Sequence, residues 1–300
     1  MSAALPEMRP RADIQMSNPA AGGGSTLEKI ETPRVRWHVQ RSGAGPAVVL
    51  LHGTGAAIHS WRTLTPKLDR DFLVIAPDLP GHGGSEILDP GVISLPAMAR
   101  ELQRLFSVLE VEPALLVGHS AGAALALRMT LDGRARPAGL IAINGAFVPY
   151  GGAAGRLLAP LAGLCGSSRL LTGFLARQAR DPRAVGRVIA STGSTLDRTA
   201  LEHYSLTWQD PAHLAATFAM MGNWDLRSLQ RDMPALGVPL HLLVADNDGA
   251  VDPGQAKRVV ELCRTARVTY LAGLGHVAHE EDPDLIARYI VADANRCEVR

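Results

Sequence analysis

The sequence predicts an α/β protein, with a mostly parallel β-sheet, helices on both faces and a helical lid insertion. Three observations lead to this prediction. Short apolar runs without polar alternation are typical of strands that are buried on both faces. Amphipathic segments with helical spacing separate these runs, as they do in parallel sheets. The alternation lapses between about residues 146 and 228 and then resumes, which indicates an insertion.

The composition is that of an ordinary globular enzyme. The chain has 300 residues, enough for a large core, with 47% hydrophobic and 20% charged residues. A formal net charge of +1 gives no reason to expect a nucleic-acid partner. The three cysteines are widely spaced and form no CxxC, which argues against a disulfide framework or a structural zinc site. A reducing compartment is the simpler interpretation.

The first 27 residues are expected to form a flexible leader. Residues 1–27 are rich in Ala, Pro, Gly, Ser and Met and show no periodicity. Arg9 and Arg11 are followed by no apolar stretch that would make a signal peptide. No apolar run is long enough to predict a transmembrane segment. We therefore expect a cytoplasmic protein, and peripheral contact with a membrane stays open.

The predicted α/β core comprises residues 28–145 and 229–300, and the predicted lid comprises residues 146–228. The first strand, around residues 35–39, alternates apolar and polar residues and so has one buried face. Further strands are expected at residues 47–51, 72–76, 114–117, 140–143, 240–244 and 268–271. Helices are expected around residues 61–68, 95–109, 121–129 and 254–263, and from residue 282 onwards.

A Gly-x-Ser-x-Gly motif from Gly118 to Gly122 lies between a predicted strand and a predicted helix. In the α/β-hydrolase fold this motif forms the nucleophile elbow, a sharp turn that lifts the serine hydroxyl above the carboxyl edge of the sheet. Only small flanking residues tolerate such a turn, which explains the two glycines. The context argues against an incidental glycine turn. We therefore predict an α/β-hydrolase fold with Ser120 as the nucleophile.

A serine nucleophile needs a base within hydrogen-bond reach, and in this fold the acid and the histidine follow the serine in that order. His276 follows the predicted strand at 268–271 and is the expected base. Asp246 and Asp248 both follow the strand at 240–244. Asp248 is preferred as the acid because it lies deeper in its loop.

Two backbone N–H groups are expected to stabilise the oxyanion of a tetrahedral intermediate. The N–H of Ala121 comes directly after the nucleophile. The second donor is expected in the glycine-containing loop after the first buried strand, where Thr54 is our choice and Gly55 the alternative. Loss of one such donor typically lowers the rate by about 10²–10³-fold, so these groups matter as much as the triad.

The remaining histidines and acidic residues give no reason to expect a metal or a cofactor. His276, His279 and Glu280 superficially resemble a metal-binding group, but the spacing suggests no further ligand. Asp225 is another candidate acid, for which a structural role at the end of the lid is the preferred interpretation. The remaining histidines have ordinary structural interpretations: His52 shapes its glycine loop, His119 packs beside the elbow and His82 borders the pocket.

Several segments also resemble one subgroup of the hydrolases, the magnesium-chelatase accessory proteins of bacteriochlorophyll biosynthesis. The resemblance covers about residues 33–290. The segments are Trp37-His38-Val39-Gln40, Leu51-His52-Gly53-Thr54-Gly55-Ala56, His59-Ser60-Trp61-Arg62, Val117-Gly118-His119-Ser120-Ala121-Gly122-Ala123, Asn144-Gly145-Ala146, Met220-Met221 and Gly273-Leu274-Gly275-His276-Val277-Ala278-His279-Glu280-Glu281.

This resemblance implies a role near magnesium insertion into protoporphyrin, in the cytoplasm or at the inner membrane face. It implies a tetrapyrrole as the small-molecule substrate and transient contact with magnesium chelatase subunits, but no known reaction. The chain has no P-loop motif, so an ATP-driven chelatase step would belong to those partners.

The predicted lid is basic, as arginine recognition of a tetrapyrrole would require. Between residues 156 and 200 it has seven arginines and two aspartates, a balance of +5. Arginine suits carboxylates such as porphyrin propionates, and several leucines offer apolar area. For any single arginine, however, a solvated basic face is the preferred interpretation. His203 and His213 are expected to be core or surface residues rather than magnesium ligands. The arginines are at positions 156, 169, 177, 180, 183, 187 and 198.

Three functions are therefore open. The first is a serine hydrolase that cleaves a carboxylic ester. The resemblance suggests that this ester belongs to a tetrapyrrole intermediate. The second is a non-catalytic protein that binds and delivers porphyrin to the chelatase. The third is a general esterase, lactonase or carbon–carbon bond hydrolase outside pigment metabolism. Dehalogenase and epoxide-hydrolase chemistry is disfavoured, because those relatives have aspartate where this chain has Ser120.

Overall fold

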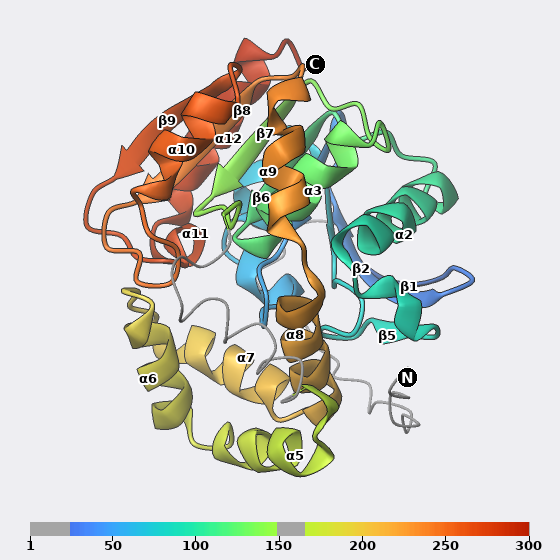
Figure 1. Cartoon of the computed structure of the whole chain (residues 1–300), viewed down its shortest axis with the longest axis vertical. Coiled ribbons are helices and arrows are strands. Elements are labelled where there is room, and N and C mark those ends of the chain that lie inside the picture. Colours follow the sequence, from blue (N-terminus) through green and yellow to red (C-terminus); the bar gives the residue numbers. More distant parts are fainter. Residues whose placement is uncertain (1–24, 149–165, 300) are drawn as a thin grey trace.

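A computed structural model describes residues 25–148 and 166–299 as a sheet with helices on both faces and a helical cap (Figure 1). The strands run in the order β1-β2-β4-β3-β6-β7-β8-β9, and β5 pairs with β2. From β4 to β9 all pairs are parallel, while β2 pairs antiparallel with β1, β4 and β5. The predicted mostly parallel sheet is confirmed. The strands are β1 (Thr26–Glu31), β2 (Val35–Ser42), β3 (Ala47–Leu51), β4 (Leu73–Pro77), β5 (Glu86–Ile87), β6 (Leu115–His119), β7 (Gly139–Ile143), β8 (Leu240–Ala245) and β9 (Ala266–Leu271).

Helices connect the parallel strands and cover the sheet. Those of the core are η1 (Ile58–Trp61), α1 (Thr65–Leu68), η2 (Pro90–Val92), α2 (Leu95–Val108), α3 (Ala121–Leu131), α9 (Leu226–Asp232), η3 (Met233–Ala235), α10 (Gln255–Leu262), α11 (Ala278–Glu281) and α12 (Pro283–Arg296). Those of the cap are α5 (Arg169–Gln178), α6 (Pro182–Ser191), α7 (Arg198–Trp208) and α8 (Pro211–Asn223). Within the described ranges, no helix combines the length and apolar character needed to cross a bilayer.

The central strand β3 shows why a continuous apolar run forms this sheet. All five of its residues are buried. Because successive side chains point to opposite faces, Val49 and Leu51 pack with α2 and α3, whereas Val48 and Leu50 pack with α1 and α12. Full burial of each such side chain contributes about 1.5–3 kcal/mol. The run is therefore apolar throughout, since both faces of the strand are covered.

The cap lies beyond the carboxyl ends of the parallel strands, between β7 and β8 in the sequence (Figure 1). Three of its helices begin at an aspartate whose side chain accepts a backbone N–H of the first turn: Asp181 at α6, Asp197 at α7 and Asp210 at α8. Within the cap, α5 packs on α8 and α6 packs on α7. Each capping bond satisfies an N–H group that would otherwise lack a partner at the helix end.

Two expected boundaries differ from the structure. Strand β1 begins at Thr26, so the last two residues of the segment expected as leader pair with β2. Helix α9 begins at Leu226, inside the segment expected as lid, yet it packs on α3 and buries Leu229 in the main core. Residues 1–24 and 149–165, and with them Arg156, lie outside the described part of the chain.

Candidate active site

Ser120 lies in a sharp turn between β6 and α3. Its φ of 51° and ψ of −116° lie in a region that residues other than glycine rarely occupy. Three backbone hydrogen bonds hold this conformation. Ser120 N–H donates to the carbonyl of Ile143 at 3.0 Å, and the Ser120 carbonyl accepts N–H groups of Ala123 and Ala146, both at 3.1 Å. Such strain persists only where the surrounding structure determines it.

The two glycines of the motif are required by close backbone approach. A Cβ at Gly118 would lie 2.4 Å from the backbone of Ala123. A Cβ at Gly122 would lie 2.0 Å from the carbonyl oxygen of Leu51 at the end of β3. Both distances are far below van der Waals contact, so neither position accommodates a side chain without movement of the backbone. The glycines thus allow β3 and α3 to pack tightly around the turn that presents Ser120.

Asp248 and His276 are brought together from the loops after β8 and β9. Nδ1–H of His276 donates to Oδ2 of Asp248 at 2.8 Å. The other oxygen, Oδ1, accepts the N–H groups of Ala250 and Val251, both at 2.8 Å. The Asp248 carboxylate is buried and fixed by these three bonds. The imidazole therefore keeps Nε2 as the ring nitrogen available to a substrate or a nucleophile.

The two other candidate acids have different partners. Asp246 is exposed, and its Oδ1 accepts the N–H of Gly273 at 2.7 Å, which joins the loops after β8 and β9. Asp225 caps α9 by accepting backbone N–H groups at the start of that helix. Among the three predicted candidates, Asp248 is thus the acid that contacts His276.

Asn144, for which no role was predicted from the sequence, holds the backbone at His276. Its Nδ2 donates to the carbonyls of Gly275 at 3.0 Å and His276 at 2.8 Å, and its Oδ1 accepts the N–H of Ala245 at 2.8 Å. His119 Nε2–H also donates to the His276 carbonyl, at 2.9 Å. Asn144 has a φ of 48°, which asparagine tolerates better than most residues. An asparagine before glycine at the end of a buried strand was the available signal.

The segment between α6 and α7 joins the cap to both loops of the pair. The carbonyl of Thr192 accepts the N–H of Gly249 at 3.0 Å and the N–H of His276 at 3.2 Å. Two residues further on, Ser194 Oγ accepts the N–H of Val277 at 2.9 Å. These contacts span more than fifty residues of sequence. No local pattern could have predicted them.

The loop after β3 fixes the direction of the Thr54 N–H. The carbonyl of Gly53 accepts His52 Nδ1–H at 2.8 Å and Ala56 N–H at 3.1 Å. His52 Nε2 accepts the N–H of Leu79 at 2.9 Å, which assigns the proton to Nδ1. Burial lowers the pKa of His52, so the ring stays neutral near pH 7. Because the peptide unit is planar and trans, the Thr54 N–H points away from the anchored Gly53 carbonyl.

This loop lies against the elbow, as two donors for one oxyanion require. A Cβ at Gly53 would lie 3.1 Å from the Cβ of Ser120. Ala121 is the first residue of α3, so its N–H has no partner within the helix. Neither the Ala121 N–H nor the Thr54 N–H donates to an acceptor in residues 25–148 or 166–299. Both groups are free to bind a ligand oxygen.

The cap also binds the Gly55 carbonyl of this loop. The Gly55 carbonyl accepts Trp208 Nε1–H of α7 at 2.7 Å and His213 Nε2–H of α8 at 3.1 Å. The other nitrogen of His213, Nδ1, accepts the N–H of Gly83 at 3.1 Å. His213 is therefore a buried core residue that joins α8 to two loops, in agreement with the interpretation preferred from the sequence.

The suggested metal group of His276, His279 and Glu280 does not converge. His279 lies between the rings of Trp61 and His119, and burial lowers its pKa to about 3. Glu280 accepts hydrogen bonds from Arg62 and from the Tyr204 hydroxyl, while His276 faces Asp248. In the part of the chain that is described, no group of three such residues could hold a metal ion.

Glu280 connects the core to the cap through a buried carboxyl group. Its Oε1 accepts the Tyr204 hydroxyl of α7 at 2.7 Å, and its Oε2 accepts the Arg62 guanidinium beside η1. Burial raises the pKa of Glu280 to about 7, although Arg62 and Tyr204 both act in the opposite direction. The group therefore titrates near neutral pH.

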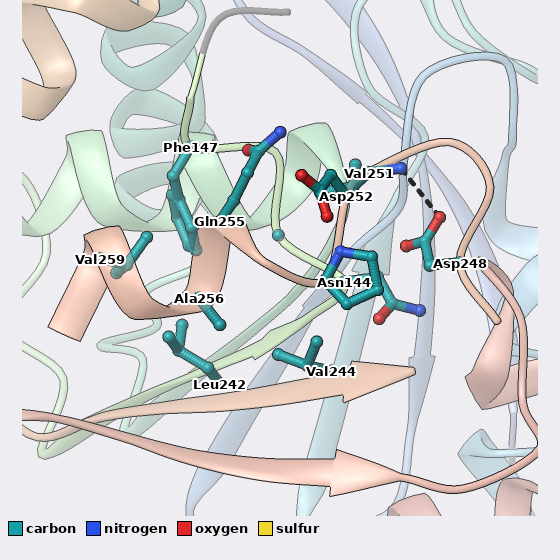
Figure 2. Close-up of a pocket in the computed structure, with 12 residues that line it drawn as sticks. Asn144, Phe147, Leu242, Val244, Asp248, Val251, Asp252, Gln255, Ala256 and Val259 are labelled. Atoms are coloured by element: carbon teal, nitrogen blue, oxygen red, sulfur yellow. Dashed lines mark hydrogen bonds between the residues drawn. The ribbon is translucent and has the colours of Figure 1, made fainter. Parts of the chain in front are cut away.

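A small cavity lies beside the acid of the pair (Figure 2). Its volume of about 20 Å³ has room for one water molecule. Asp248 and Asn144 border it on one side, and Phe147 and Val259 border it on the other. Ser120 and His276 are not part of its lining. The cavity is thus a packing space behind the pair, too small for an organic substrate.

Residues 48–289 match the model of the alpha/beta hydrolase family, and the chain belongs to this family. The Magnesium-chelatase 30 kDa subunit of Rhodobacter capsulatus is 33% identical over 263 residues, which cover 86% of this chain and 90% of that protein. The chain belongs to the same family as that subunit. The resemblance inferred from the sequence is confirmed.

Other similarities are shorter or show the fold alone. A fluoroacetate dehalogenase of Burkholderia sp is 38% identical over 94 residues, which cover 30% of this chain and 31% of that protein. Among solved structures, an alpha/beta hydrolase fold protein from Burkholderia ambifaria superimposes with a TM-score of 0.72 at 21% identity, covering 89% of this chain and all of that one. The epoxide hydrolase CorEH gives a TM-score of 0.76 at 19% identity, covering 91% and 99%.

Proposed function

We propose that this protein is a serine hydrolase that acts in bacteriochlorophyll synthesis near the magnesium insertion step and cleaves a carboxylic ester. The observations that carry the proposal are the strained Ser120 and, in the loops at the same edge of the sheet, a histidine whose Nδ1–H is fixed by a buried aspartate. A serine hydroxyl gains nucleophilicity from such a base. A protein that only bound a ligand would need neither a strained serine in a nucleophile elbow nor an oriented histidine at the same edge of the sheet.

In the proposed reaction, His276 Nε2 accepts the proton of Ser120 Oγ as the oxygen attacks the ester carbonyl carbon. Asp248 stabilises the imidazolium that forms and keeps the ring oriented. The N–H groups of Ala121 and Thr54 would bind the oxyanion. Collapse of the intermediate expels the alcohol, which takes the proton from His276. Water then attacks the acyl-serine by the same route, which releases the acid and restores Ser120.

The substrate class is proposed from the relative rather than from a pocket. The Rhodobacter capsulatus protein is named as a subunit of magnesium chelatase. For this chain we propose a tetrapyrrole ester as the small-molecule substrate and transient contact with chelatase subunits. The arginines of α5 and α6 that could bind propionates are exposed on the outside of the cap, so we do not assign them to the substrate.

Complementation of a deletion strain tests whether catalysis is required. The Ser120→Ala variant removes the hydroxyl and leaves the fold, so we expect it to fail to restore pigment while wild-type protein succeeds. The matched control is Ser107→Ala, an exposed serine on α2. The second candidate function is non-catalytic delivery of porphyrin, which the name of the Rhodobacter relative favours. Full restoration of pigment by Ser120→Ala would support delivery and contradict hydrolysis.

A further inference from the structure

The most exposed apolar side chains of the cap lie on one helix. In α5, Leu170 is 89% exposed and Phe174 is 56% exposed. The two are four residues apart and so lie on the same side of the helix. The opposite side, with Thr172 and Ala176, is buried where α5 packs on α8. Helix α5 thus presents an apolar ridge on a side that packs on no other element of residues 25–148 and 166–299.

Five exposed arginines lie on this helix, on the turn after it and on α6. We call the exposed arginine and large apolar residues of α5, the turn after it and α6 the outer cap face: Arg169, Leu170, Phe174, Arg177, Arg180, Arg183, Arg187 and Val188. None of these arginines forms an ion pair within residues 25–148 and 166–299. By contrast, Arg198 and Arg258 on other helices pair with glutamates. Asp181, the one acidic residue between Arg169 and Val188, caps α6.

The shape of this face suits an extended partner better than a small ligand. Helix α5 lies at one end of the long axis of the molecule, with α7 and α8 between it and the core (Figure 1). Small molecules bind in concave sites, whereas a projecting helix with apolar residues among cationic ones can enter a membrane interface. Arginines at such a position are attracted to anionic headgroups.

We propose that the outer cap face binds the surface of an anionic lipid bilayer. Leu170 and Phe174 enter the boundary between headgroups and acyl chains, and the surrounding arginines contact lipid phosphates. This orientation places the cap, whose α7 and α8 hold the Gly55 carbonyl, next to the bilayer. The proposal does not depend on ester hydrolysis, because it concerns a surface on the outer side of the cap.

Co-sedimentation of the full chain with vesicles tests this proposal. We expect binding to vesicles of phosphatidylcholine and phosphatidylglycerol at 70:30 and little binding to pure phosphatidylcholine. Binding should fall strongly at high salt, because exposed charges are screened. Each arginine near an anionic surface contributes about fivefold, so Arg177→Gln with Arg180→Gln should weaken binding about 25-fold. Leu170→Ser with Phe174→Ser should weaken it about a hundredfold.

Matched controls come from the amino ends of the strands, at the opposite edge of the sheet from the cap. Arg136→Gln with Arg264→Gln removes two exposed arginines there, and Val108→Ser removes an exposed apolar residue. These controls should bind vesicles as the wild type does. Equal losses of vesicle binding in the outer-cap-face variants and in the control variants would overturn the proposal. Failure of the wild-type protein to bind either kind of vesicle would also overturn it. In the latter case, a pigment defect of the arginine variant in cells would point to an acidic protein surface instead.

Discussion

At the scale of single residues, the site depends on backbone conformations that few residues can adopt. Ser120 has a φ of 51° and is held there by neighbours on β7 and α3. Gly118 and Gly122 make this possible because other backbone atoms lie where the Cβ of any other residue would be. The glycines of the motif are therefore a steric requirement of the turn, in addition to marking the position of the candidate nucleophile.

The steric requirement predicts a large difference between two glycine substitutions. In Gly122→Ala the new Cβ would meet the Leu51 carbonyl oxygen at 2.0 Å, so the unfolding free energy should fall by roughly 3 kcal/mol or more. In Gly173→Ala the Cβ meets nothing within 4 Å, in the interior of α5. That control should be neutral or gain about 0.5–1 kcal/mol. Urea unfolding of both variants measures the difference, and equal effects would contradict the account of the elbow.

Glu280 predicts a pH dependence of stability. Its folded pKa of about 7 lies above its ordinary value of 4.5, so the folded protein binds one more proton than the unfolded protein between these pH values. The free energy of unfolding therefore loses a contribution of up to about 3 kcal/mol as pH rises from about 4.5 to 7. Glu280→Gln should remove this loss. The exposed Glu261→Gln is the control.

Buried histidines with lowered pKa values, such as His59 and His279, contribute in the opposite direction. The quantity to compare is therefore the difference between wild type and each variant in urea unfolding at pH 5, 6, 7 and 8. A wild-type-minus-variant difference for Glu280→Gln that does not change with pH would show that Glu280 does not titrate in this range.

At the scale of elements, the cap helices act on the loops of the site. Helices α7 and α8 bind the Gly55 carbonyl next to the proposed oxyanion donor, and the segment before α7 binds the loops of Asp248 and His276. The cap is therefore a part of the site and more than a cover over it. A small displacement of the cap would change the directions of several groups at once.

Trp208→Phe tests this coupling. The substitution keeps most of the ring volume and removes the Nε1–H that donates to Gly55. We expect the rate of Ser120 modification by an ester-like probe to fall by about tenfold, since one neutral hydrogen bond is worth about 1 kcal/mol and the loop gains freedom. Trp224→Phe removes a comparable bond to Ile93, at 2.9 Å, outside the site. The same rate in both variants and in wild type would argue against a role of the cap.

The elements that were predicted correctly share one property: their pattern is local. Strands β3, β4 and β7 are continuous apolar runs, and β6 and β8 are apolar apart from His119 and His241, because both faces of each strand are covered. Strand β1 was missed because it is an edge strand with a mostly exposed, charged sequence. The single helix expected around residues 61–68 is two short helices, η1 and α1. The contacts of Asn144, Thr192 and Trp208 were missed because their partners are far away in the sequence.

At the scale of the whole molecule, the fold brings residues from distant parts of the chain to one edge of the sheet. Because the strands are parallel, the loops that carry Thr54, Ser120, Asp248 and His276 all follow carboxyl ends and meet there. This is why these loops could be expected from the sequence to lie close together. Their exact distances could not be predicted, because they depend on packing between the cap and the core.

The central claim, that Ser120 is an activated nucleophile, is tested most directly by reaction with a fluorophosphonate probe and peptide mass spectrometry. The account predicts one adduct, on Ser120, whose rate of formation falls by about 10³-fold or more in His276→Gln, since the serine loses its base. Asp248→Asn should slow it as well. No adduct, or an adduct that forms as fast without His276, would contradict the claim.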